Sequence, residues 1–126
     1  MSENQKRVLI VEDDQHISKV YEIQLAKEGL FTILARDGEE AVKMVENEKP
    51  DLIILDLMLP KKDGFWVLEE MRKNSKYSKI PILVISNLGQ KTDAARALEL
   101  GATEYLVKID HPIQELVDRI NSYFKK

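Results

Sequence analysis

The chain has 126 residues, enough for one compact domain and too few for two. Its 44% hydrophobic and 33% charged residues exclude a disordered protein, and the lack of cysteine excludes disulfides and thiolate sites. A net charge of −3 argues against a general nucleic-acid-binding surface. No apolar stretch approaches the roughly 18 residues that span a bilayer, and the polar N-terminus resembles no signal peptide. We therefore expect a soluble, cytoplasmic protein with no direct nucleic-acid contact and no membrane insertion.

Short apolar runs alternate with amphipathic segments along the chain. The first run is residues 8–11, and it is followed by a predicted helix that ends near Gly29. One face of that helix carries Ile17, Val20, Tyr21 and Leu25. The second run is 31–34, and a capping box at 37–40 opens a second helix that ends near 49–50.

The third and fourth units repeat this pattern. The run 52–55 precedes a helix that follows Gly64 and is marked by Val67, Leu68 and Met71. The run 82–85 precedes a helix that stops near Gly101. Its apolar positions are Ala94, Ala95 and Leu98.

The fifth unit has a weaker run, 105–107, and the clearest helical stripe. That stripe follows Pro112 and contains Ile113, Leu116, Val117, Ile120 and Phe124. The runs are apolar at consecutive positions, which is typical of strands buried on both faces. Five strand–helix units predict an α/β fold with a parallel sheet covered on both faces.

Polar side chains follow these runs directly, where each strand ends. Ligands of such folds bind at the carboxyl ends of the strands, and there stand Glu12, Asp13, Asp56, Ser86 and Lys108. Taken singly, the acidic residues could cap helices, the serine could be a turn residue and the lysine could be solvated. Together, crowded carboxylates repel one another unless a cation such as Mg²⁺ offsets their charge. With a lysine suited to phosphate, the set predicts phosphoryl transfer to an aspartate.

The chain resembles a response-regulator receiver domain over about residues 6 to 125. The motifs that carry the resemblance are residues 8–14, 55–60 with 63–64, 84–86 and 105–108. It implies a flavodoxin-like (βα)5 three-layer sandwich, with a five-stranded parallel sheet in the order 2-1-3-4-5. Residues 1–126 are then one receiver domain.

The resemblance also implies the roles of the acidic residues. Asp56 is the phosphoacceptor, and Asp13 and Asp56 bind Mg²⁺, or Mn²⁺ in its place, with the backbone carbonyl of Met58. Glu12 acts on the metal directly or through a bound water. Asp14 falls outside this set and is interpreted as a helix N-terminal residue.

A switch is implied as well. Lys108 bridges to Asp56 and then to the phosphoryl group, to which Ser86 donates a hydrogen bond. Tyr105 then turns inward, and the surface of the fourth helix, fifth strand and fifth helix changes its partners. The implied partners are a sensor histidine kinase or phosphotransfer protein and a downstream protein. The expected oligomeric state is a monomer or a phosphorylation-dependent dimer.

Two positions depart from the family pattern, and two others bear on hydrolysis. Ile109 replaces the usual proline after the lysine, so the loop 109–112 is expected to differ in shape. Asn87 is larger than usual and is expected to narrow access to Asp56. Met58 and Leu88 cannot bind a hydrolytic water through their side chains, which predicts slow self-dephosphorylation.

Two other functions compete with this signalling role. A metal-dependent phosphohydrolase with Asp56 as nucleophile lacks its proton donor, because position 58 is methionine. A phosphorylation-independent pseudo-receiver is disfavoured by the intact set of Asp13, Asp56, Ser86 and Lys108. The favoured hypothesis is a signalling domain and not an enzyme. Such a domain catalyses only its own phosphorylation and slow dephosphorylation.

Overall fold

A computed structural model of the protein describes residues 5–87, 91–108 and 113–124. Its strands form one parallel sheet in the order β2-β1-β3-β4-β5, as predicted. The strands are β1 (Arg7–Val11), β2 (Phe31–Ala35), β3 (Leu52–Leu55), β4 (Ile82–Ser86) and β5 (Glu104–Val107). The helices are α1 (Gln15–Lys27), α2 (Gly38–Glu48), α3 (Gly64–Lys73), α4 (Lys91–Glu99) and α5 (Ile113–Phe124), with a short 3₁₀ helix η1 (Ser75–Tyr77).

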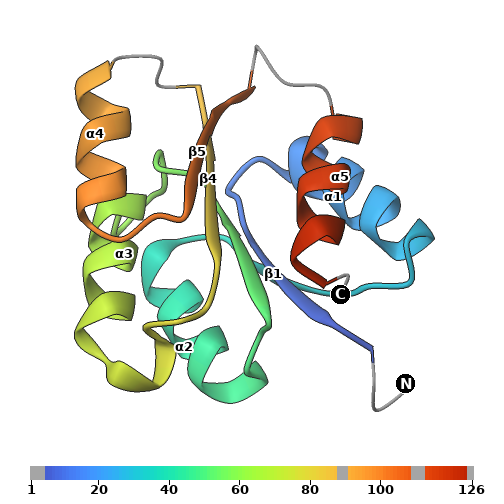
Figure 1. The fold of residues 1–126 in the computed structure, drawn as a ribbon, viewed down its shortest axis with the longest axis horizontal. Helices are drawn as coiled ribbons and strands as arrows, with labels where there is room; N and C mark the ends of the chain where they lie inside the picture. Colours follow the sequence, from blue (N-terminus) through green and yellow to red (C-terminus); the bar gives the residue numbers. More distant parts are fainter. Residues whose placement is uncertain (1–4, 88–90, 109–112, 125–126) are drawn as a thin grey trace.

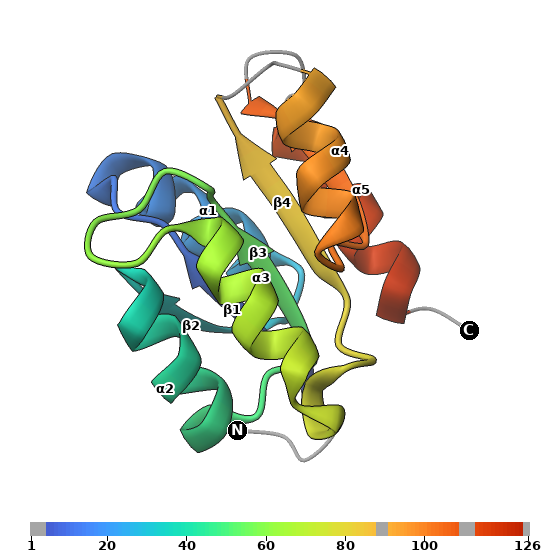
Figure 2. The same ribbon diagram turned by 90° about the vertical axis from the view of Figure 1, so that its left-hand side faces the viewer.

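The sheet lies between two helical layers, with α1 and α5 on one face and α2, α3 and α4 on the other (Figures 1 and 2). Each face has its own apolar core, because alternate strand residues point to opposite sides. In β1, Leu9 and Val11 pack toward α2 and α3, while Val8 and Ile10 pack toward α1 and α5. The flavodoxin-like three-layer prediction is confirmed. Every helix in the described residues is too short or too polar to cross a membrane.

Helix starts and stops follow the predicted signals. Asp14 caps α1 and accepts hydrogen bonds from the backbone N–H groups of His16 and Ile17. At α2 the carboxylate of Asp37 accepts from the N–H of Glu40 at 2.8 Å. Gly29, beyond the end of α1, has a φ of +80°, which glycine adopts without strain.

Two helices depart from the predicted burial: α1 buries Tyr21 and Leu25 of its predicted face but not Val20, and α4 buries a different side. Val20 of α1 is 47% exposed, although it was assigned to the apolar face with Tyr21. In α4 the buried residue is Ala97, whereas Leu98 is 49% exposed. Helix α4 packs mainly against β5, the edge strand of the sheet, so only a narrow stripe of it is covered.

The 3₁₀ helix after α3 was not predicted, and Arg72 holds the chain that follows it. The guanidinium donates hydrogen bonds of 2.7–3.0 Å to the carbonyls of Tyr77, Ser78, Ile80 and Gly101. Burial lowers the pKa of Arg72. Gly101 has a φ of +113°, and a Cβ there would lie 2.4 Å from Cγ of Arg72. One side chain therefore joins α3 to the segment before β4 and to the loop before β5.

Replacing Arg72 with methionine should lower the free energy of unfolding by about 2 kcal/mol, because the partly buried carbonyls lose their donor. Urea unfolding followed by circular dichroism measures the change. Arg36→Met is the matched control, since Arg36 is exposed and its substitution should change stability by less than about 0.5 kcal/mol. Equal losses in the two variants would contradict this account of Arg72.

Candidate functional site

Three charged residues from separate strand ends meet at the carboxyl edge of the sheet. Lys108, directly after β5, donates a 2.6 Å hydrogen bond from Nζ to Oε1 of Glu12 and a 2.9 Å bond to Oδ2 of Asp56. The side chains of Lys108, Asp56 and Glu12 are only 12%, 9% and 4% exposed. The sequence-based expectation that the three lie together agrees with this geometry.

The loop after β3 fixes the orientation of Asp56. The backbone N–H of Met58 donates to Oδ1 at 3.1 Å, so each carboxylate oxygen of Asp56 has a donor. Gly64, at the start of α3, lies so close that a Cβ there would be 2.6 Å from the carbonyl oxygen of Asp56. The N–H of Gly64 donates to the carbonyl of Leu57, which closes the loop. Only glycine permits this approach.

Burial and charge shape the ionisation of the cluster. Burial raises the pKa of Glu12, the Lys108 hydrogen bond opposes that shift, and the negative charge of Asp56 adds to it. Burial lowers the pKa of Lys108, but its hydrogen bonds to Glu12 and Asp56 outweigh this effect, and the net pKa is raised. Lys108 therefore stays protonated at neutral pH and neutralises part of the acidic cluster.

Asp13 lies beside this cluster, at an open hollow of about 510 Å³ that it lines with Met58 and Asp63. Both Asp13 and Met58 are exposed, so their oxygens can reach a solvated ion. Among the described residues, no three Asp, Glu, His or Cys side chains are grouped closely enough to hold a metal. Mg²⁺ does not need such a cage, because it keeps several waters and takes one or two carboxylates. The donor set around the hollow fits Mg²⁺.

The two residues assigned to the switch lie on neighbouring strands. Ser86 is fully buried at the end of β4, and Tyr105 is half-buried in β5, opposite Val84. Tyr105 packs against the core beneath α2, α3 and α4. Burial, followed by the charges of Asp93 and Asp56, raises its pKa. Leu88 and the loop 109–112 lie outside the described residues, and Asn87 is exposed.

Sequence reasoning missed two features of this region. It paired Lys108 with Asp56 but not with Glu12, which forms the shorter of the two bonds. It also missed a nearly apolar hollow of about 320 Å³ beside the cluster. This hollow is lined by His16, Ile17, Val20, Tyr21 and Lys108. The signal that could have revealed this hollow is an apolar residue of α1 that does not pack into the core, Val20.

Tyr21, which lines this hollow, should make the stability of the fold depend on pH. Burial raises its pKa from 10.0 to about 12, so the folded state resists ionisation. Its contribution to stability is complete below pH 10 and is lost as the pH rises through about 12. Tyr21→Phe should therefore lose less stability than wild type between pH 10 and 12, by roughly 2 kcal/mol at most. Urea midpoints across this range test the prediction, and parallel profiles would refute it.

Comparison with known proteins agrees with this architecture. Residues 8–121 match the family described as response regulator receiver domain. The chain is 42% identical over 124 residues to a probable transcriptional regulator, ycf27, of Guillardia theta, a match that covers 98% of this chain and 47% of the relative. The chain spans about half the length of the curated relatives it matches.

Solved structures give the same result. The BeF3-activated receiver domain of Klebsiella pneumoniae RstA superposes with a TM-score of 0.87 at 28% identity, covering 96% of this chain and 100% of that one. The Mn²⁺-bound form of the response regulator Rcp1 superposes with a TM-score of 0.83 at 32% identity, covering 94% of each chain. The fold, the strand-end residues and these matches together establish that the chain belongs to the response regulator receiver domain family.

Proposed function

We propose that residues 1–126 act as one receiver domain that accepts a phosphoryl group on Asp56. One observation carries the proposal: Asp56 is largely buried, and both of its oxygens are held by donors, Lys108 Nζ and the Met58 N–H. A carboxylate fixed in this way keeps one orientation toward an incoming phosphorus, which is what phosphoryl transfer requires.

The proposed reaction forms a bond between an Asp56 oxygen and phosphorus. The bond from phosphorus to the donor's nitrogen or oxygen breaks, and the leaving group keeps the electron pair of that bond. An imidazole leaving group takes up a proton from water, and acetate leaves as the anion. The product carries more negative charge beside Glu12, and Lys108 is placed to neutralise it, because Nζ already contacts both carboxylates. Beyond its own phosphorylation and the slow hydrolysis of the aspartyl phosphate by water to inorganic phosphate, we propose no enzymatic activity.

The proposed metal is Mg²⁺, with Mn²⁺ as an alternative. Asp13, Asp56 and the backbone carbonyl of Met58 would hold it, with Glu12 acting directly or through water. When bound, the ion neutralises charge on the transferred phosphoryl oxygens. Two observations support this set: Asp13 and Met58 line one hollow, and a structural relative, Rcp1, was solved in a Mn²⁺-bound form.

A protein is the proposed phosphodonor, either a sensor histidine kinase or a phosphotransfer protein. Support comes from α1, where Val20 and Ile23 are each 47% exposed. The apolar hollow of Val20 adjoins Lys108, so a partner helix packed there would bring its phosphohistidine toward the cluster. A cytoplasmic location follows from such partners and stays a prediction.

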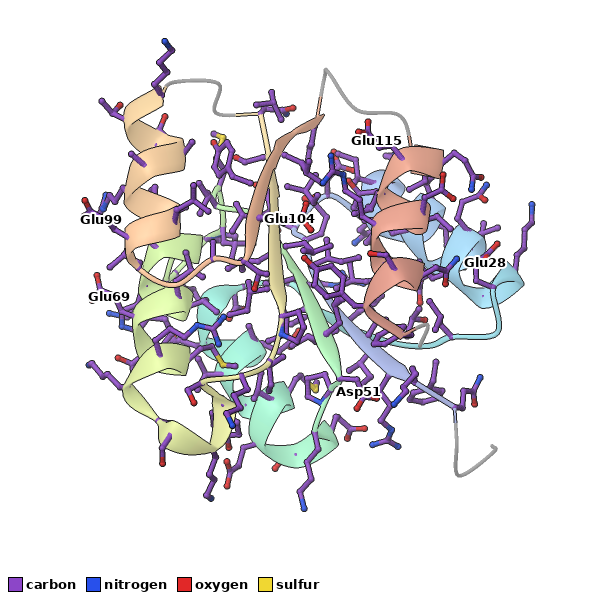
Figure 3. All side chains as sticks on the ribbon, viewed as in Figure 1. Glu28, Asp51, Glu69, Glu99, Glu104 and Glu115 are labelled. Atoms are coloured by element: carbon purple, nitrogen blue, oxygen red, sulfur yellow. The ribbon has the colours of Figure 1, made fainter. Side chains whose placement is uncertain are left out.

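The proposed output surface is formed by α4, β5 and α5. Glu104 of β5 and Glu115 of α5, both labelled in Figure 3, contact Arg119 of α5, and Tyr123 also donates to Glu104. A shift of β5 on movement of Tyr105 would therefore carry α5 with it. A protein partner is proposed for this face, without direct nucleic-acid contact by these 126 residues. The proposed oligomeric state is a monomer or a phosphorylation-dependent dimer.

Incubation with acetyl phosphate and Mg²⁺, followed by intact mass spectrometry, tests the proposal. One added phosphoryl group is expected, and none is expected in Asp56→Ala or without a divalent cation. Continued turnover of small phosphate esters would instead indicate a phosphohydrolase. No change in mass, with or without metal, would indicate a pseudo-receiver.

A further inference from the structure

A second concave surface lies at the end of the molecule opposite Asp56. Helices α2 and α3 run side by side in both views of the fold, and η1 follows α3 (Figures 1 and 2). Between them are two hollows of about 660 and 510 Å³ that share Glu46 and Tyr77. We call this continuous surface the α2–α3 groove. Nothing in the proposed phosphoryl chemistry uses it.

The floor of the groove is apolar. It is formed by Val42, Val45, Pro50, Met71, Tyr77 and Ile80. Met71 is buried beneath it, while Tyr77 and Ile80 are only partly buried and pack on the core. An apolar floor between two helices can accept apolar side chains of a partner.

The rim of the groove is positively charged, although the whole chain carries −3. Its lysines are Lys43, Lys49, Lys73 and Lys76, and its acidic residues are Glu46 and Glu70. Glu70 pairs with Lys73 at 2.8 Å, and Glu46 pairs with Lys76 at 3.8 Å. Within the described part of the chain, Lys43 and Lys49 have no carboxylate at ion-pair distance. Two positive charges are left for a partner to neutralise.

Arg72 makes one wall of the groove rigid. Its hydrogen bonds hold the carbonyls of Tyr77, Ser78 and Ile80, which belong to the segment between η1 and β4. A surface that is held in place before binding loses less conformational entropy when a partner docks. The groove is therefore a preformed surface, not a gap between mobile loops.

We propose that the α2–α3 groove binds an acidic amphipathic helix of a partner protein. Leucine-like side chains on one face of that helix would fill the floor, and carboxylates on its flanks would pair with Lys43 and Lys49. Glu46 and Glu70 stand on the rim. A helix can place its carboxylates beside Lys43 and Lys49 and away from these two residues, whereas the evenly spaced phosphates of a nucleic acid cannot avoid them, which favours a peptide. The partner would dock without covering the carboxyl edge of the sheet.

A synthetic amphipathic peptide of leucine and glutamate, and a second with lysine in place of glutamate, can test this. The full chain, labelled with ¹³C at its methionine methyl groups, offers Met71 under the groove and Met58 at the phosphorylation site as NMR reporters. We expect the acidic peptide to shift the Met71 signal and to leave Met58 unchanged. The lysine peptide should bind at least tenfold more weakly.

Charge reversal gives a matched pair of variants. Lys43→Glu with Lys49→Glu should weaken binding of the acidic peptide at least tenfold. Lys19→Glu with Lys27→Glu changes the net charge equally on exposed positions of α1 and should leave affinity within about twofold. Urea midpoints check that both variants fold.

Several results would overturn the proposal. They are an unchanged Met71 signal, equal binding of the two peptides, equal loss in both double variants, or a stronger Met71 shift with a single-stranded oligonucleotide than with the acidic peptide. None of them depends on phosphorylation of Asp56, so the groove and the phosphoacceptor role can fail separately.

Discussion

Lys108→Met should lower the rate of phosphorylation from acetyl phosphate by at least about a hundredfold, or about 2.7 kcal/mol in activation free energy. The expected reason is electrostatic: charge grows on the transferred group beside Asp56 and Glu12, and Nζ is the cation that contacts both. Intact mass measured against time gives the rate. A rate within tenfold of wild type would contradict the proposed role of Lys108.

The same substitution should also lower the free energy of unfolding, by about 3 kcal/mol, because two buried carboxylates lose their shared cation. Lys61→Met is a matched control: Lys61 is exposed, and its nearest carboxylate, that of Asp37, is 3.7 Å away. Its effect should stay below about 0.5 kcal/mol. Glu12→Gln in the Lys108→Met background should recover stability, since it removes one uncompensated buried charge. If stability does not recover, the buried charge left without a partner in Lys108→Met is not that of Glu12.

The fold was predictable because its signals are local. Consecutive apolar positions such as 52–55 marked strands buried on both faces, and Asp37 with Glu40 marked a helix start that the structure contains. The rule that ligands bind at strand ends then singled out Asp56 and Lys108 without any coordinates. The order of the strands came from the resemblance, because an apolar run does not say which strand it pairs with.

The contacts that the sequence did not predict join elements that are far apart along the chain. Glu12 and Lys108 follow β1 and β5, which are separated by β3 and β4, and only the length of the lysine side chain joins them. The partners of Arg72 are backbone carbonyls, which leave no sequence signature. At about 100° per residue, Val20 lies about 140° around α1 from Leu25, so an apolar residue at the margin of the stripe was taken as buried.

Mg²⁺ should stabilise the folded chain before any phosphoryl group is present, because only the folded state can assemble the ligands proposed for it, Asp13 and Asp56. At a concentration a hundred times the Kd, the free energy of unfolding should rise by about 2.7 kcal/mol. Urea unfolding with and without Mg²⁺ measures this. Fluorescence of Trp66, half-buried in α3 near the hollow of Asp13, should report the titration directly.

Asp13→Asn should weaken Mg²⁺ binding at least tenfold, about 1.4 kcal/mol, because it removes one of the two carboxylates proposed to contact the ion. Asp14→Asn is a close control: it makes the same change in charge one residue away, and asparagine preserves the cap of α1. Asp14 points its carboxylate at the N–H groups of the helix, so its loss should leave Mg²⁺ affinity within about threefold. Equal losses in the two variants would show that the ion responds to the general acidity of this edge, and the specific ligand set would then be wrong.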